Sequence, residues 1–451
     1  MATFDKKAPG VYVEEISKLP PSVASVATAI PGFVGYTERG TKNTAIRVES
    51  LIDFEEKFGY ACKIAISEED KINGLEYKLH ESMRLFYANG GGICYVVSVG
   101  NYTDAISNTA LETGISMLEP IDEVTMIVVP DAVSLEIKDL ASVQNAALAQ
   151  CLELKDRVAI LDVKDTGNCN TDATNFRNSI GTKGASYGAA YYPYIKSVYD
   201  REINVYDIYK GLELSNQELE NAQYYAELSE PTEESTLFAK QLMSKPEYAK
   251  LVAKIQEQAN LLPPSGAIAG IYCANDNQRG VWHAPANMSV SGISDINVRI
   301  SDKQQGELNE NTSGKCINAI RAFQGKGILV WGARTLDGLS SEWKYISVRR
   351  FFNYVEESIQ ASTAWAVFQP NDANTWVKVR CQIENFLSNL WRDGALAGST
   401  PQEAFYVRVG INQTMTAQDI LNGYMIVEIG MAAVRPAEFI VLQFSHKLQE
   451  S

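Results

Sequence analysis

The sequence contains no C-x-x-C pair, and its seven cysteines are scattered over the whole chain. Disulfide frameworks and zinc knuckles need closely spaced cysteines, so neither is expected, and buried reduced thiols fit a cytoplasmic protein better. The sequence also lacks an apolar leader after Met1. No run approaches the roughly 20 apolar residues that span a bilayer. We therefore expect a chain folded in the cytoplasm, without a metal site or membrane insertion.

Basic residues are in the minority, because 40 Lys and Arg are set against 55 Asp and Glu, for a formal net charge of −15. Proteins that bind nucleic acids neutralise phosphates with a basic stripe, and no such stripe is evident here. A nucleic-acid partner is therefore not expected. The acidic balance favours solubility or a basic protein surface as partner.

Histidine is also scarce, which limits the catalytic chemistry available to the chain. Gly184-Ala-Ser-Tyr-Gly188 matches the G-x-S-x-G pattern of a nucleophile elbow centred on Ser186. An elbow lies between a strand and a helix, whereas here a loop precedes the motif and a strand follows it. None of the three histidines, His80, His283 and His446, lies in a recognisable partner motif. The motif therefore does not support a catalytic role, and no catalytic residue is assigned. A serine hydrolase using Ser186 is kept as an alternative function.

Two glycine-containing motifs lack the order that phosphate binding requires. Asn89-Gly-Gly-Gly92 follows a helix and precedes a strand, which is the reverse of a phosphate loop. Ser313-Gly-Lys315 lacks the spacing of a Walker motif. No cofactor is therefore expected.

Apolar runs alternate between strand and helix patterns over the first 200 residues. Strands are predicted at Gly32–Tyr36, Ile93–Val99, Val124–Val129 and Arg157–Val163, and helices at Ser50–Phe58, with Ser50 as cap, at Gly74–Asn89 and at Val143–Glu153. This alternation predicts an α/β fold with a largely parallel sheet. From Ala267 a strand is expected, then a helical turn holding Asp276 and Arg279.

At about 150 residues per domain, 451 residues suggest two to four domains. We expect a multidomain α/β and α+β chain divided as 1–20 (an N-terminal arm strand), 21–100 (the N-terminal part of the core), 101–200 (an α/β middle domain), 201–262 (an acidic helical insertion on the outer surface), 263–335 (a return to the middle domain), 336–435 (a C-terminal domain) and 436–451 (a C-terminal arm strand).

Aromatic and basic residues interleave in a helical pattern after Lys344. On a helix, Val348, Phe351, Phe352 and Val355 form an apolar stripe, apart from Ile346, Arg350, Asn353 and Glu357. The charged face is a candidate for docking onto another protein. The basic residues assigned to such a surface are Lys344, Arg349, Arg350, Arg380 and Arg392.

Each end of the chain carries a strand pattern without a neighbouring hairpin partner. The residues concerned are Val11, Tyr12, Val13, Glu14 and Glu15 at one end, and Phe439, Ile440, Val441, Leu442, Gln443 and Phe444 at the other. Unpaired strands need a sheet edge that accepts them, so we expect both to add to neighbouring subunits. The alternative is that both strands fold back onto a sheet of their own subunit.

Four segments of the last third, 343–358, 365–372, 391–398 and 435–446, closely resemble the C-terminal domain of contractile tail sheath proteins. Residues 9–15 and 30–40 are similar to the N-terminal part of the same family, and residues 266–290 look like its central motif. The resemblance is weak over 101–262. A static tube or capsid protein remains a further alternative, which would not need flexible arms.

The resemblance implies a structural subunit that polymerises helically around an inner tube and contracts to drive it through a cell envelope. It implies a subtilisin-like middle domain without protease activity, a homo-oligomer of stacked hexameric rings, and an inner tube, a baseplate and terminal cap proteins as partners. The C-terminal domain, with its basic residues, would face the tube. Assembly in the bacterial cytoplasm is expected, with the particle then kept or released.

Overall fold

A computed structural model describes residues 23–67, 71–228, 230–310 and 312–440. The chain divides into two compact units. One comprises residues 26–356 with 434–440, and we call it the α/β unit. The other comprises 23–25 with 357–433, and we call it the C-terminal unit. The division falls inside one helix, α12 (Ile346–Thr363). It therefore comes later in the chain than residue 336, where the sequence analysis places the start of the C-terminal domain.

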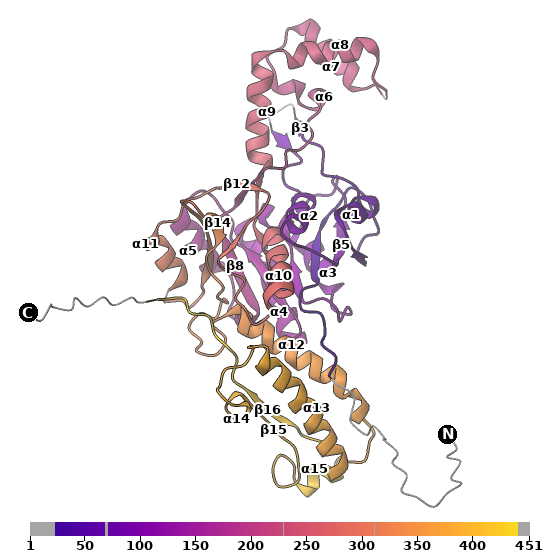
Figure 1. Ribbon diagram of the computed structural model, residues 1–451. Coiled ribbons are helices and arrows are strands. Elements are labelled where there is room, and N and C mark those ends of the chain that lie inside the picture. Colours follow the sequence, from indigo (N-terminus) through magenta and orange to yellow (C-terminus); the bar gives the residue numbers. More distant parts are fainter. Residues whose placement is uncertain (1–22, 68–70, 229, 311, 441–451) are drawn as a thin grey trace, which may run out of the picture. The chain divides into compact units, whose positions relative to one another are not determined.

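A sheet of nine strands runs through the described part of the α/β unit (Figure 1). Its order is β11 (Met288–Ser289), β14 (Gly327–Val330), β13 (Ile317–Phe323), β8 (Gly188–Tyr192), β7 (Val158–Asp162), β6 (Met126–Val128), β1 (Pro31–Tyr36), β5 (Cys94–Gly100) and β2 (Ala45–Val48). The six central strands, from β13 to β5, are parallel. Strands β14, β11 and β2 pair antiparallel at the two edges. The predicted parallel sheet is confirmed.

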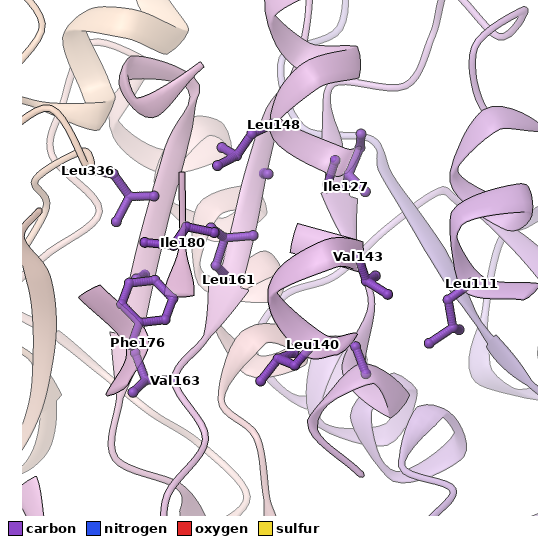
Figure 2. Close-up of a cluster of buried hydrophobic side chains, with 14 of the residues drawn as sticks. Leu111, Ile127, Leu140, Val143, Leu148, Leu161, Val163, Phe176, Ile180 and Leu336 are labelled. Carbon is purple, nitrogen blue, oxygen red and sulfur yellow. The ribbon is translucent and has the colours of Figure 1, made fainter. Parts of the chain in front are cut away.

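Helices cover both faces of this sheet, so its strands are apolar on both sides. One face packs against α3 (Asn108–Ser116), α4 (Ile137–Leu154) and α5 (Cys169–Ser179), and the other against α1 (Leu51–Phe58), α2 (Leu79–Ala88) and α10 (Ser265–Arg279). In β7, Ala159 and Leu161 face the first layer, and Val158 and Ile160 face the second. Figure 2 shows the first layer, where Leu140 and Val143 of α4 lie near Ile127 and Phe176 lies near Val163.

Local signals explain some helix starts. Ser50 caps α1, because its side chain accepts a hydrogen bond from the backbone N–H of Asp53 at 3.1 Å. The strand expected from Ala267 is wrong, since Ser265–Arg279 is one helix, α10. Its first nine residues are fully buried between the sheet and α2, and an apolar run of that length has no exposed face to reveal a helical period.

The described part of residues 201–262 contains four α-helices, which are α6 (Val205–Ile208), α7 (Asn216–Ala226), α8 (Glu233–Met243) and α9 (Pro246–Ala259). They enclose a small core of their own around Tyr209, Phe238 and Leu242. A second cluster joins Ile208 and Ile255 to Ile64 and Ile66 of the first hundred residues. The insertion is therefore a folded helical element packed onto this α/β unit.

Short strands complete the α/β unit. They are β3 (Ala65–Ile66) paired with β4 (Ile72–Asn73), and β9 (Ile195–Ser197) between β10 (Leu261–Leu262) and β12 (Ile293–Ile296); α11 (Asp302–Asn309) packs near β13.

The C-terminal unit contains the end of α12, α13 (Ala373–Arg392), α14 (Pro401–Ala404), α15 (Ala417–Leu421) and a two-stranded antiparallel sheet of β15 (Phe405–Arg408) and β16 (Glu428–Met431). Asp372 caps α13 through the backbone N–H of Thr375. In α13, Val379, Ile383, Phe386, Leu387 and Leu390 follow a helical period and form the buried face.

Candidate functional sites

Ser186 lies in a short 3-10 turn, Ala185–Tyr187, immediately before β8. It therefore lies at the amino end of a parallel strand. His80 lies in α2, next to Leu79, whose N–H bonds to Asp131 just beyond the carboxyl end of β6. A strand of five residues is roughly 16 Å long, so Ser186 and His80 lie at opposite ends of the parallel strands. His446 is outside the described residues.

Ser186→Ala should therefore leave stability and assembly unchanged, because within the described residues no hydrogen bond joins the Ser186 hydroxyl to a histidine. Labelling with a fluorophosphonate probe checks this directly. Stoichiometric labelling of Ser186 in the folded protein would restore the hydrolase reading.

Two aspartates that the sequence analysis did not single out lie at the carboxyl ends of parallel strands: Asp131 just beyond β6, and Asp162 as the last residue of β7. Asp131 accepts hydrogen bonds from the backbone N–H groups of Tyr36, Lys78 and Leu79, at 2.7, 2.5 and 2.9 Å. Asp162 accepts one from Ser265 at the start of α10, at 2.9 Å, and burial raises the pKa of Asp162 to about 7. Both carboxyls and Ser265 are fully or almost fully buried.

These groups tie loops and helix starts to the sheet, and their burial leaves no room for a substrate. The signal that could have found them is a carboxylate where an apolar strand pattern ends, as in Val129-Pro-Asp131 and Leu161-Asp162.

A buried ion pair fastens the start of the insertion to the same unit. The Arg201 guanidinium contacts Glu81 at 2.7 Å and donates to the backbone oxygens of Gly74 and Tyr77. Although burial opposes ionisation of Glu81, Arg201 lowers the pKa of that carboxyl to about 2. Sequence spacing could not have found this pair, because its members are 120 residues apart.

Two of the five candidate basic residues are buried inside the α/β unit. Arg349 is 5% exposed, stacks on the rings of Trp343 and Tyr187, and donates to Asn353. Arg350 is 4% exposed and forms a bidentate ion pair with Asp276, with contacts of 3.0 and 2.6 Å. The expected charged docking face is therefore wrong for this part of α12. These arginines are committed to contacts within the subunit.

The other three basic residues are more accessible. Arg380 pairs loosely with Glu384 at 3.8 Å, and Arg392 is exposed near the end of α13. Lys344 lies over the Tyr345 ring in the α/β unit. Arg380 and Arg392 share one helix of the C-terminal unit and remain candidates for a partner surface.

The N-terminal strand residues, Val11, Tyr12, Val13, Glu14 and Glu15, lie outside the described residues, as do Val441, Leu442, Gln443 and Phe444. Phe439 and Ile440 are described, and they are 71% and 80% exposed. Immediately before them, the Glu438 carboxylate binds Arg334 at 2.6 Å. The exposed residues Phe439 and Ile440 thus come directly after the ion pair between Glu438 and Arg334.

Within the described ranges, no group of His, Cys, Asp and Glu side chains is arranged to hold a metal ion. None of the helices seen in those ranges is both long and apolar enough to cross a membrane.

Comparison with known proteins gives two family matches that together run over most of the chain. Residues 104–336 match the family described as phage tail sheath protein central domain, and residues 340–447 match the phage tail sheath C-terminal domain.

Solved structures extend the similarity to nearly the whole chain. The sheath complex of an extracellular contractile injection system, PVC, in its contracted state is 32% identical, with a TM-score of 0.69 and 99% of each chain covered. The contracted helical sheath of the anti-feeding prophage is 30% identical, with a TM-score of 0.67 and 97% of this chain and 99% of the other covered.

Among curated sequences, the tail sheath protein of Vibrio phage KVP40 is 23% identical over 192 residues, which is 42% of this chain and 27% of the phage protein. The matched segments span less than half of the curated relatives' own length.

Proposed function

Because this chain belongs to the phage tail sheath family, we propose that it is the structural subunit of a contractile sheath that polymerises helically around an inner tube and drives that tube through a cell envelope. The observation that carries the proposal is the end-to-end similarity to a contracted PVC sheath, at 32% identity over 99% of both chains. The buried polar groups at the sheet edge support a structural role over an enzymatic one.

The test is electron microscopy of the purified chain expressed alone. We expect long hollow tubes, because heterologous contacts that repeat along the sheath axis do not close on themselves and so extend the assembly without limit. Uniform compact particles at every concentration would contradict the proposal.

The inner tube, a baseplate and terminal cap proteins are the proposed partners, with subunits arranged as stacked hexameric rings. Assembly in the bacterial cytoplasm, followed by retention or release of the particle, belongs to the same proposal. The α/β unit, with helices on both faces of a mostly parallel sheet, supports a subtilisin-like origin without protease activity.

The two-stranded sheet of the C-terminal unit supports the proposal that terminal strands are exchanged between subunits. In the described residues, β15 pairs with β16 alone, leaving an outer edge on each strand. Two-stranded sheets are marginally stable, and added strands pair these edges. The arm strands at residues 11–16 and 438–444 have the alternating or apolar composition that this requires.

We place the acidic insertion, residues 201–262, on the outer surface of the assembled sheath. Its helices α7 and α8 carry exposed acidic side chains, including Glu220, Glu233 and Glu234, which favour contact with solvent. A surface insertion should be dispensable for polymerisation.

Replacing residues 202–258 with a Gly/Ser linker, together with Ile64→Thr and Ile66→Thr, should preserve tube formation. The two substitutions are needed because the insertion covers both isoleucines. Retaining Arg201 keeps its ion pair with Glu81. The measurement is tube length by negative-stain microscopy, with thermal melting as the control for folding. A folded variant that stays monomeric would show that the insertion is an interface.

A further inference from the structure

The last described segment, residues 434–440, returns to the α/β unit after the chain has passed through the C-terminal unit. The segment is largely exposed, and its polar contacts within the described residues are made by the Glu438 side chain. Its Oε1 accepts a hydrogen bond from Nε of Arg334 at 2.8 Å, and its Oε2 accepts one from Nη2 at 2.6 Å. The hydroxyl of Tyr345 donates to the same Oε2 at 3.1 Å.

Arg334, which binds the Glu438 carboxylate, is held in place by contacts with the sheet. Arg334 is 1% exposed, and Asn318 of β13 brackets its backbone by accepting from its N–H and donating to its carbonyl oxygen, both at 2.8 Å. Its Nη1 donates to the backbone oxygen of Asn309 at 2.9 Å. These three contacts orient the guanidinium without involving the terminal segment.

A buried guanidinium without a counter-ion is costly, so this position requires a carboxylate. Glu438 supplies it, and its side chain is 20% exposed whereas that of Arg334 is 2% exposed. The Arg350–Asp276 pair differs, because both of its side chains are 3% exposed. One ion pair therefore lies wholly in the core, and the other joins the core to a largely exposed segment.

We propose that Arg334, Tyr345 and Glu438 form a latch that fixes where the C-terminal arm leaves its own subunit. The inference rests on the proposed exchange of arms, and it assigns the anchoring point that such an exchange needs. Phe439 follows the latch directly, so the latch sets the origin and direction from which the arm strand reaches a neighbouring subunit. Arg334 and Tyr345 act here as positioning residues.

Glu438→Gln in the full chain tests the latch, because it keeps the shape of the side chain and removes its charge. Chymotryptic cleavage at Phe439 in the unassembled subunit should accelerate roughly tenfold or more, the effect of losing hydrogen bonds between charged groups. Tubes should become shorter or absent. Tyr345→Phe, which leaves the ion pair intact, should fall between wild type and Glu438→Gln in both measurements.

Glu310→Gln is the matched control, since Glu310 borders the same hollow beside Arg334 without being its ion-pair partner. It should match wild type in cleavage and in tube length. The latch is overturned if Glu438→Gln is cleaved at the wild-type rate, or if its arm is released and its tubes remain as long as those of wild type. Failure of the wild-type chain to form tubes would instead remove the proposed function, while the cleavage rates would still report on the latch.

Discussion

Deletion of residues 1–18, or of residues 441–451, should give a subunit that folds normally and builds no long tubes. The sequence places an apolar strand pattern in each deleted segment, and such strands gain backbone hydrogen bonds by adding to a sheet edge. The C-terminal deletion begins after Ile440 so that Glu438 stays on Arg334. Removing residues 437–451 would also take the carboxylate partner away from the buried Arg334.

Tube length by negative-stain microscopy measures this effect, and circular dichroism with thermal melting checks the fold. A deletion of residues 1–8, which ends before Pro9 and keeps the strand pattern, is the matched control and should assemble. If both strand deletions formed tubes of normal length, each terminal strand would belong to its own subunit.

Arg350→Ala should lower the free energy of unfolding by about 3–5 kcal/mol, because it leaves a buried carboxylate without its partner. Arg350 and Asp276 are joined by two contacts, a third hydrogen bond runs to the backbone oxygen of Thr28, and the guanidinium stacks on Tyr272 at 4.6 Å. The Arg350 side chain therefore joins the beginning of α12 to α10 and to the segment before β1.

Chemical denaturation of the soluble subunit measures this change. Arg380→Ala is the control, because its exposed pair with Glu384 should contribute less than about 0.5 kcal/mol. The double variant Arg350→Met with Asp276→Leu should be more stable than Arg350→Ala, since it leaves no unpaired charge. If Arg350→Ala melted like wild type and lost only binding to the inner tube, the original docking interpretation would stand.

The strands of the α/β unit could be predicted because each is a short apolar run bounded by turn residues. Those predicted around Phe33, Val96, Ile127 and Ile160 are confirmed as β1, β5, β6 and β7. Helix α1 was predictable because Ser50 is a strong cap before an amphipathic stretch. Helix α10 was not, because nearly every position of its first turns is buried.

The buried polar contacts could not be predicted, because they join residues far apart in the sequence. Arg350 and Asp276 are 74 residues apart, and Arg334 and Glu438 are 104 apart. Lys344-Tyr-Ile-Ser-Val-Arg-Arg350 therefore resembles a solvated basic surface until the carboxylates that neutralise it are located. The net charge and the helical spacing of a segment describe that segment alone. They do not identify the distant residue that pairs with one of its side chains.

Cryo-electron microscopy of the intact particle before and after contraction tests the central claim most directly. We expect a helical array of this chain around an inner tube in both states, shorter and wider after contraction, with the nine-stranded sheet of each subunit unchanged. A particle whose array keeps the same length and diameter while the tube is ejected, or in which this chain lies outside the array, would contradict the account.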